Sequence, residues 1–154
     1  MPDAGLGAGR GPVLRFLDDL RAAEAAGATV FEAWAAVCAA DALRGGLRTI
    51  AEREAGNATL LADRLGELGV PCEAAVRDSL RFAALARFGA AEVSDDDKLG
   101  LLLARYDDDH AVGRPIARVL DELDPDLETR EILRLVAAGE QATIAWLRAY
   151  RGQG

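Results

Sequence analysis

Apolar residues recur every three to four positions through most of this chain, which is the period of one face of an α-helix. Stretches of alternating apolar and polar residues are missing, so we expect no strands. Candidate helix caps, glycines and prolines divide the pattern into four long helices and one short helix. The predicted helical ranges are 12–39, 42–68, 73–87, 95–123 and 125–150.

Capping residues support these boundaries. Asp41, Ser94 and Asp124 are the predicted N-caps. Gly69 is predicted to end the second helix, because glycine adopts the left-handed conformation that often follows a helix. Pro115 lies inside the third long helix, where it should introduce a kink or remove one hydrogen bond.

The connections predict how the helices are arranged. Only a few residues join the first two helices, so these should form an antiparallel hairpin. Residues 70–93 can carry the chain back along the bundle, and their short helix has apolar residues that could cover it. We therefore predict an all-α fold, an up-down four-helix bundle with a long crossover between its second and third helices. Residues 12–151 would form this domain, and the Gly-rich residues 1–11 would form a flexible tail.

Polar residues interrupt the apolar face of each long helix. A buried carboxylate or amide is unfavourable unless a partner binds it, so these residues mark a candidate site. The interruptions are Glu24 in the first long helix, Glu54 and Asn57 in the second, Asp107 and His110 in the third, and Glu140 and Thr143 in the fourth. Glu32, another acid of the first helix, lies off the apolar face and ranks second to Glu24.

The acids are placed symmetrically about the turns between helices. Glu24 and Glu54 lie equally far from the first turn, and Asp107 and Glu140 lie equally far from the last. Such residues have the same height in an antiparallel hairpin, so we expect four carboxyl groups to face one site in the middle of the bundle. The inward residue of the third long helix stays open among three candidates, Asp107, Asp108 and His110.

This arrangement resembles the ferritin-like superfamily, and most closely its rubrerythrin-type members. The resemblance implies that two helices each supply a Glu and two each supply Glu-x-x-His, which together bind two iron or manganese ions. By that likeness the metal-ligand positions are Glu24, Glu54, Asp107 and Glu140, with Asp107 as a shorter acid. Asn57 and Thr143 stand where the family has its two histidines.

The missing histidines change the expected chemistry. Imidazole is a strong ligand for iron, whereas the Asn carbonyl and the Thr hydroxyl are weak oxygen donors. His110 could restore one nitrogen ligand, or it could be a hydrogen-bonded histidine of the core or rim. Without a metal the acids would repel one another, and Arg114, one turn beyond His110, could reach inward as their counter-charge.

We interpret the chain as a degenerate ferritin-like protein that lacks redox-active di-iron chemistry. It would act as a binding or structural module, with no bound cofactor and no enzymatic activity. The alternative is a carboxylate-bridged di-metal oxidoreductase or metal-binding protein that holds iron or manganese. Iron storage in a large shell is a weaker third hypothesis, because no interface for a cage is recognisable.

Composition indicates the number of domains, the classes of partner that are excluded and the location of the protein. With 154 residues and a net charge of −8, the chain suits one domain and is unsuited to bind nucleic acid or anionic membranes. No apolar run approaches the roughly 20 residues of a membrane span. The first residues lack the apolar core of a signal peptide, so we expect a cytoplasmic protein.

Two further expectations concern the cysteines and the assembly. Cys38 and Cys72 should lie too far apart along the second helix for a disulfide, and no spacing typical of a zinc site is present. We expect a homodimer formed through the Ala-rich outer faces of the helices.

Overall fold

The structure is a computed structural model that describes residues 11–153, and within that range every regular element is a helix. The elements are α1 (Gly11–Val37), α2 (Asp41–Glu67), α3 (Asp78–Phe88), α4 (Asp95–Leu103), the 3-10 turn η1 (Ala111–Gly113), α5 (Arg114–Glu122) and α6 (Leu127–Arg151). The all-α prediction is confirmed. The predicted N-terminal tail lies outside the described residues, except for Gly11, which begins α1.

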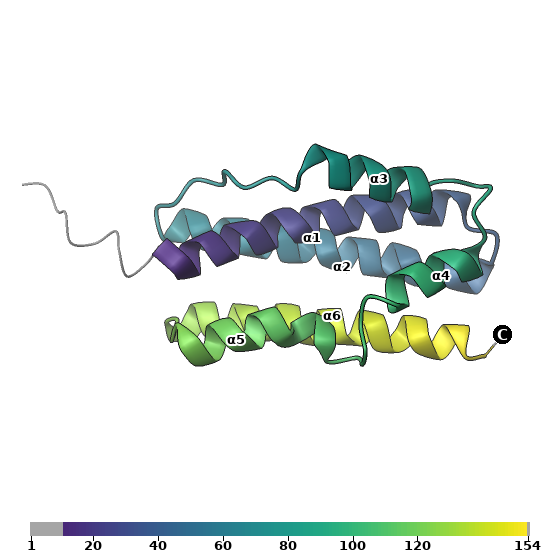
Figure 1. The fold of residues 1–154 in the computed structure, drawn as a ribbon. Helices are drawn as coiled ribbons and strands as arrows, with labels where there is room; N and C mark the ends of the chain where they lie inside the picture. The colour runs from purple at the N-terminus through teal and green to yellow at the C-terminus, as the bar shows by residue number, and fades with distance from the viewer. Residues whose placement is uncertain (1–10, 154) are drawn as a thin grey trace, which may run out of the picture.

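The first two long helices form the predicted hairpin. α1 and α2 are joined by residues 38–40 and lie side by side along their length (Figure 1). The N-cap position of α2 is Ala40 and not Asp41, which is the first helical residue and pairs with Arg44 at 2.8 Å. Gly69 has a φ of +74° and follows the end of α2, as its sequence position predicted.

The crossover runs back along α1 and carries the predicted short helix, but that helix starts later than expected. One carboxylate oxygen of Asp18 accepts hydrogen bonds from the backbone N–H groups of Glu73 at 2.9 Å and Ala74 at 2.8 Å. These bonds hold the chain against α1 outside any helix, and α3 begins only at Asp78.

α3 covers the bundle only at its C-terminal end. The Phe88 ring lies 5.4 Å from that of the fully buried Trp34 of α1. Leu80 and Phe82, two of the apolar residues of this helix, remain 62% and 60% exposed, so they do not cover the bundle.

The third long helix, predicted over residues 95–123, is broken into α4 and α5. Ser94 caps α4 as predicted, because its hydroxyl accepts from the backbone N–H of Asp97 at 3.1 Å. The helix ends at Leu103, and residues 104–110 are not helical. The Asp108 carboxylate stabilises the segment before η1, because it accepts from the backbone N–H groups of His110 and Ala111 at 2.8 and 2.9 Å.

The break changes the place of Pro115 and leaves an irregular segment that α6 holds. Pro115 lies in the first turn of α5, where its missing N–H costs no hydrogen bond, and not inside a helix as predicted. Arg148 of α6 fixes the irregular segment, because it donates to Asp109 at 2.8 Å and to the carbonyl oxygen of Tyr106 at 3.1 Å.

The start of α6 is fixed by a side-chain cap and by α2. Asp126, two residues beyond the predicted cap, accepts from the backbone N–H of Thr129 at 3.0 Å. The buried Arg64 of α2 donates to Thr129, Asp126 and Glu128. This network joins α2 to the first turn of α6.

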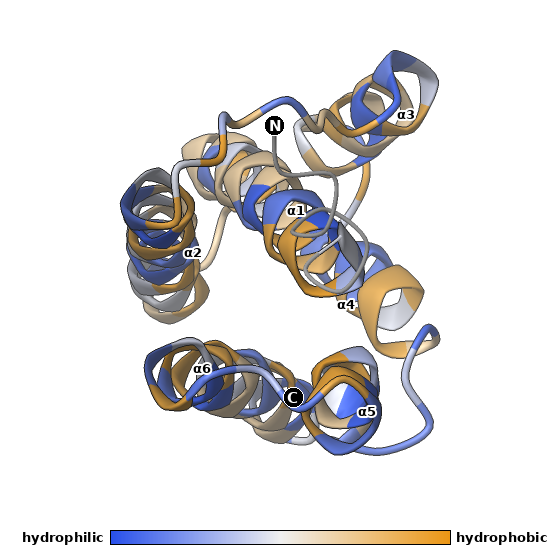
Figure 2. Cartoon of the chain, turned by 90° about the vertical axis from the view of Figure 1, so that its left-hand side faces the viewer, coloured by the Kyte–Doolittle hydropathy of each residue, from blue (hydrophilic) through white to orange (hydrophobic). Residues whose placement is uncertain are grey.

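The core consists of two apolar clusters that lie at opposite ends of the bundle. The first lies toward the C-terminal end of α1 and is called the C-end cluster. It includes Phe31, Trp34, Leu43, Leu47, Leu99, Leu103 and Leu147. The second, called the N-end cluster, includes Leu17, Leu61, Leu65, Ile116, Val119 and Leu133. Seen along the bundle, α1 and α2 lie on one side, α5 and α6 on the other, and α3 lies outside α1 (Figure 2). None of the described helices is long and apolar enough to span a bilayer.

Two adjacent glycines in α2 provide a test of how closely α6 packs against α2. A Cβ atom on Gly46 would lie 2.0 Å from the ring of Trp146, whereas a Cβ on Gly45 would meet nothing within 4 Å. We expect Gly45→Ala to stabilise the protein by about 1 kcal/mol through helix propensity. Gly46→Ala should destabilise it by about 2 kcal/mol, because the indole must move. Urea unfolding of both variants measures the two changes, and equal effects would contradict this packing.

Candidate metal centre

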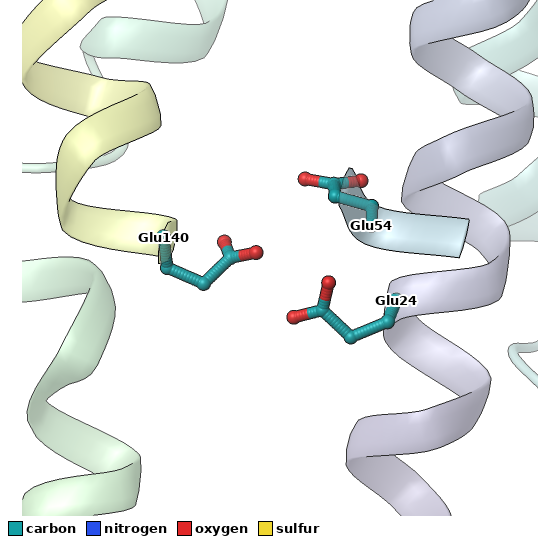
Figure 3. Close-up of side chains that lie close together, drawn as sticks. All are labelled: Glu24, Glu54 and Glu140. Carbon is teal, nitrogen blue, oxygen red and sulfur yellow. The ribbon is translucent and has the colours of Figure 1, made fainter. Parts of the chain in front are cut away.

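Three of the predicted acids meet in the middle of the bundle. Glu24 of α1, Glu54 of α2 and Glu140 of α6 point toward one another (Figure 3). One carboxylate oxygen from each residue lies within 4.8 Å of the corresponding oxygens of the other two. Glu24 is 4% exposed and Glu54 is 5% exposed, while Glu140 is partly buried. We call these three residues the glutamate cluster.

Helical spacing explains why these positions face inward. Each glutamate lies seven residues after one buried apolar residue and seven before another, which is two helical turns and therefore the same face. The flanking residues are Leu17 and Phe31 for Glu24, Leu47 and Leu61 for Glu54, and Leu133 and Leu147 for Glu140. In each case one flanking residue belongs to the C-end cluster and the other to the N-end cluster. The glutamates thus take the place of a middle apolar layer.

Gly27 of α1 provides the room for the Glu54 side chain. A Cβ atom at this position would lie 2.2 Å from Oε2 of Glu54. That oxygen is buried and has no hydrogen-bond partner among the described residues. A buried carboxylate oxygen without a partner is unfavourable, so Glu54 in its ionised form requires a proton or a cation at this point.

The two residues at the positions of the family's histidines are both hydrogen-bonded. The side-chain amide of Asn57 donates to Oε2 of Glu24 at 3.3 Å. The hydroxyl of the buried Thr143 accepts a hydrogen bond from the guanidinium of Arg53. This hydrogen bond takes the Arg53 side chain across to α6, where a Cβ on Gly139 would lie in ordinary contact with it at 3.4 Å.

Sequence reasoning missed Arg53 and expected Arg114 in its place. Arg53 lies off the apolar face of α2, so the periodicity does not select it; its only sequence signal is its place one turn before Asn57. Arg114 is exposed and pairs with Asp108 at 2.7 Å, so it is not the counter-charge of the cluster.

The third long helix supplies none of its predicted residues to the cluster. Asp107, Asp108 and His110 are all exposed, because the chain leaves the helix at residue 104 and the expected phase is lost. Asp107 therefore does not join the three glutamates as a fourth acid, and His110, predicted to be either a replacement ligand or a histidine of the core or rim, is exposed. Glu32, which ranked second in α1, is also exposed.

Tyr106 lies in the irregular segment after α4, and the glutamates change the pKa of its phenol. It packs against the C-end cluster. Burial raises the pKa of its phenol, and the nearby charges of Glu140 and Glu54 raise it further, against an opposing effect of Arg105.

Burial makes the glutamates weak acids. Desolvation, the charge of Glu140 and the charge of Glu54 raise the pKa of Glu24 to about 9, although the hydrogen bond from Asn57 opposes this. Desolvation and the charge of Glu140 also raise the pKa of Glu54 to about 9, with Arg53 acting in the opposite direction. Desolvation raises the pKa of Glu140, while a hydrogen bond with Glu24 and the charge of Arg53 lower it. Near neutral pH the cluster must therefore hold protons or a cation.

The donor set fits a hard divalent cation better than a two-iron centre. Carboxylate oxygens bind Mg²⁺ and Ca²⁺ at about 2.0–2.6 Å, so two oxygens on one ion lie at most about 5 Å apart. The 4.8 Å bound on the separations within the cluster meets this limit for Ca²⁺, whereas Mg²⁺, with a limit of about 4.2 Å, would need the carboxylates to move slightly closer. A two-iron centre needs more ligands than the cluster has, because no histidine faces it and the expected fourth acid, Asp107, is exposed.

Comparisons of this chain with models of protein families, with curated proteins and with solved structures yield no match. The ferritin-like resemblance thus stays a hypothesis that depends on the residues and helices described above.

The raised pKa of Glu24 predicts how the stability of the metal-free protein varies with pH. The folded state binds a proton more tightly than the unfolded chain, whose Glu has a pKa near 4.5. This contribution to stability is complete below pH 4.5 and is lost as the pH rises toward 9, by up to about 1.4 kcal/mol per pH unit. We expect Glu24→Gln to show a smaller decline than the wild type between pH 5 and 9. Thermal unfolding with a chelator present measures it.

Glu32→Gln is the matched control for this prediction, because Glu32 is exposed on the same helix. It should leave the pH dependence unchanged. If the Glu24 variant and the wild type lose stability in parallel, Glu24 is not the buried weak acid described above.

Proposed function

We propose that this chain is a divalent-cation-binding protein, built on a degenerate ferritin-like bundle that has lost oxygen-activating di-iron chemistry. The observation that carries the proposal is the buried, unpartnered Oε2 of Glu54 within a cluster of three carboxyl groups. A cation would give this oxygen a partner and would remove the repulsion among the three glutamates.

The chain's topology supports the ferritin-like part of the proposal. A tight hairpin of α1 and α2 is followed by a long crossover, and α5 is joined to α6 by a short second turn. Glu54 and Asn57 of α2 correspond to Glu140 and Thr143 of α6, and both pairs are near the cluster. The break between α4 and α5 is the main departure from such a bundle.

Each residue of the site would have a separate task. Glu24, Glu54 and Glu140 would bind the ion after they release their protons, and Asn57 would orient Glu24. Gly27 would keep space for the Glu54 carboxylate, and Arg53 would compensate part of the negative charge. The ion would supply a positive charge that links α1, α2 and α6. Such a link is a structural role and requires no redox change.

A second candidate is a metal-free structural module. The raised pKa values of Glu24 and Glu54, both about 9, favour it, because neutral carboxyl groups can be buried without a cation.

The homodimer also stays a prediction. The outer groove between α1 and α2 that would form it is lined by five alanines and by three exposed charged residues, Glu32, Arg48 and Glu52.

Thermal unfolding in the presence of Mn²⁺ separates the two candidates. A cation that binds only the native state should raise its stability, by about 3 kcal/mol at a concentration 100 times the dissociation constant. We expect wild-type protein stripped by a chelator to gain this stability and Glu54→Gln to lose most of the gain. Glu52→Gln, an exposed acid on the same helix, is the control and should behave as the wild type. An unchanged melting temperature in the wild type would favour the metal-free module.

The affinity for Mn²⁺ should also depend on pH. The ion competes with protons on carboxyl groups whose pKa is about 9, so the affinity rises with pH and levels off above pH 9. Calorimetry in buffers of different ionisation enthalpy should detect one to two protons released per ion near pH 7.5. Binding without proton release would place the ion at exposed acids instead.

A further inference from the structure

We propose that the glutamate cluster binds a single divalent cation per chain, and that Arg53 supplies the positive charge that a second ion would bring. This inference rests on the proposed function but goes beyond it, since it specifies the number and charge of the ions. It also separates this chain from the two-ion centres that the ferritin-like resemblance implies.

The geometry of the carboxylates fits one ion. Three oxygens lie within 4.8 Å of one another, so a point between them is at most about 2.8 Å from each, and small side-chain movements would bring all three to the roughly 2.0–2.6 Å of a bound divalent ion. Glu54 is 95% buried and points toward the other two glutamates (Figure 3), and its Oε2, beside Gly27, has no hydrogen-bond partner among the described residues. A second ion about 3.5–4 Å from the first would need further ligands of its own.

The side chains beside the cluster do not supply those ligands. Asn57 presents its N–H donor to Glu24, and the hydroxyl of Thr143 is engaged by Arg53. On the side of the broken helix, Asp108 pairs with Arg114 and Asp109 with Arg148, and Asp107 is exposed. A second ion would therefore meet hydrogen-bond donors where it needs oxygen acceptors.

Arg53 acts on the cluster although it forms no ion pair with it among the described residues. Its guanidinium binds Thr143, one turn beyond Glu140 on α6. Its charge favours the ionised forms of both Glu54 and Glu140. The hydrogen bond with Thr143 places Arg53 across the contact between α2 and α6.

The balance of charge then selects one divalent ion. Three carboxylates and one guanidinium carry a net charge of minus two when all are ionised. One divalent cation makes the buried group neutral, whereas two would leave two excess positive charges away from water. The all-oxygen donor set selects hard cations such as Mn²⁺ and Mg²⁺ over ions that prefer nitrogen or sulfur.

The test counts Mn²⁺ bound to the full chain after the protein has been stripped with a chelator. We expect one Mn²⁺ per chain by elemental analysis, with the electron paramagnetic resonance spectrum of an isolated ion. Two ions per chain, or a spectrum of coupled ions, would overturn the inference and leave the proposed function standing. The absence of any bound ion would overturn both.

The role of Arg53 is tested by comparing Tb³⁺ with Mn²⁺ in one variant. Both ions must displace the same protons, so their affinity ratio reports the charge of the site alone. Arg53→Gln should raise the ratio of Tb³⁺ to Mn²⁺ affinity by about tenfold, because the site then carries three uncompensated negative charges. Arg53→Lys should keep the wild-type ratio, as should Arg48→Gln, which alters an exposed arginine of the same helix. An unchanged ratio in Arg53→Gln would show that Arg53 does not set the charge. The ion count on the unmodified chain decides the stoichiometry even where a variant fails to fold.

Discussion

The constraint on which this structure depends is the burial of three carboxyl groups in the middle of a helical core. Glu24, Glu54 and Glu140 occupy the layer where helical spacing calls for leucine or valine, between two apolar clusters. Burial of charge is tolerated only when protons, hydrogen bonds or a cation compensate it. The features around the cluster, including Gly27 and Asn57, are consistent with that requirement.

The polar groups at the two ends of the bundle differ from those in its centre. Asp18 fixes the crossover, Arg64 fixes the start of α6, and Asp95 accepts a hydrogen bond from the buried Trp34 at 2.9 Å. Each acid among these groups accepts from N–H donors and Arg64 donates to oxygen acceptors, so each group stabilises the fold without a further ligand. Only the central layer contains a buried oxygen without a partner, Oε2 of Glu54, among the described residues. The central layer is therefore where a buried polar group still has to be compensated, by a proton or by a cation.

The sequence predicted the helices and the site to different degrees. Periodicity located α1, α2, α6 and all three glutamates, because each glutamate keeps the phase of its apolar neighbours. It failed at residues 104–110, where the Asp108 carboxylate bonds the backbone N–H groups of His110 and Ala111 in an irregular segment, since such local bonds leave the apolar pattern unchanged. The late start of α3 depends on Asp18, 55 positions before Glu73, and Arg53 bonds Thr143, 90 positions further along the chain. Neither contact has a local signal in the sequence.

The central claim is that three glutamates from three helices hold one cation. Crystals of the protein grown with Mn²⁺, measured with X-rays near the manganese absorption edge, test it most directly because the anomalous map locates the metal itself. We predict one strong peak per chain, bonded to carboxylate oxygens of Glu24, Glu54 and Glu140. A map with no peak between these residues, or with manganese only at surface acids, would contradict the account.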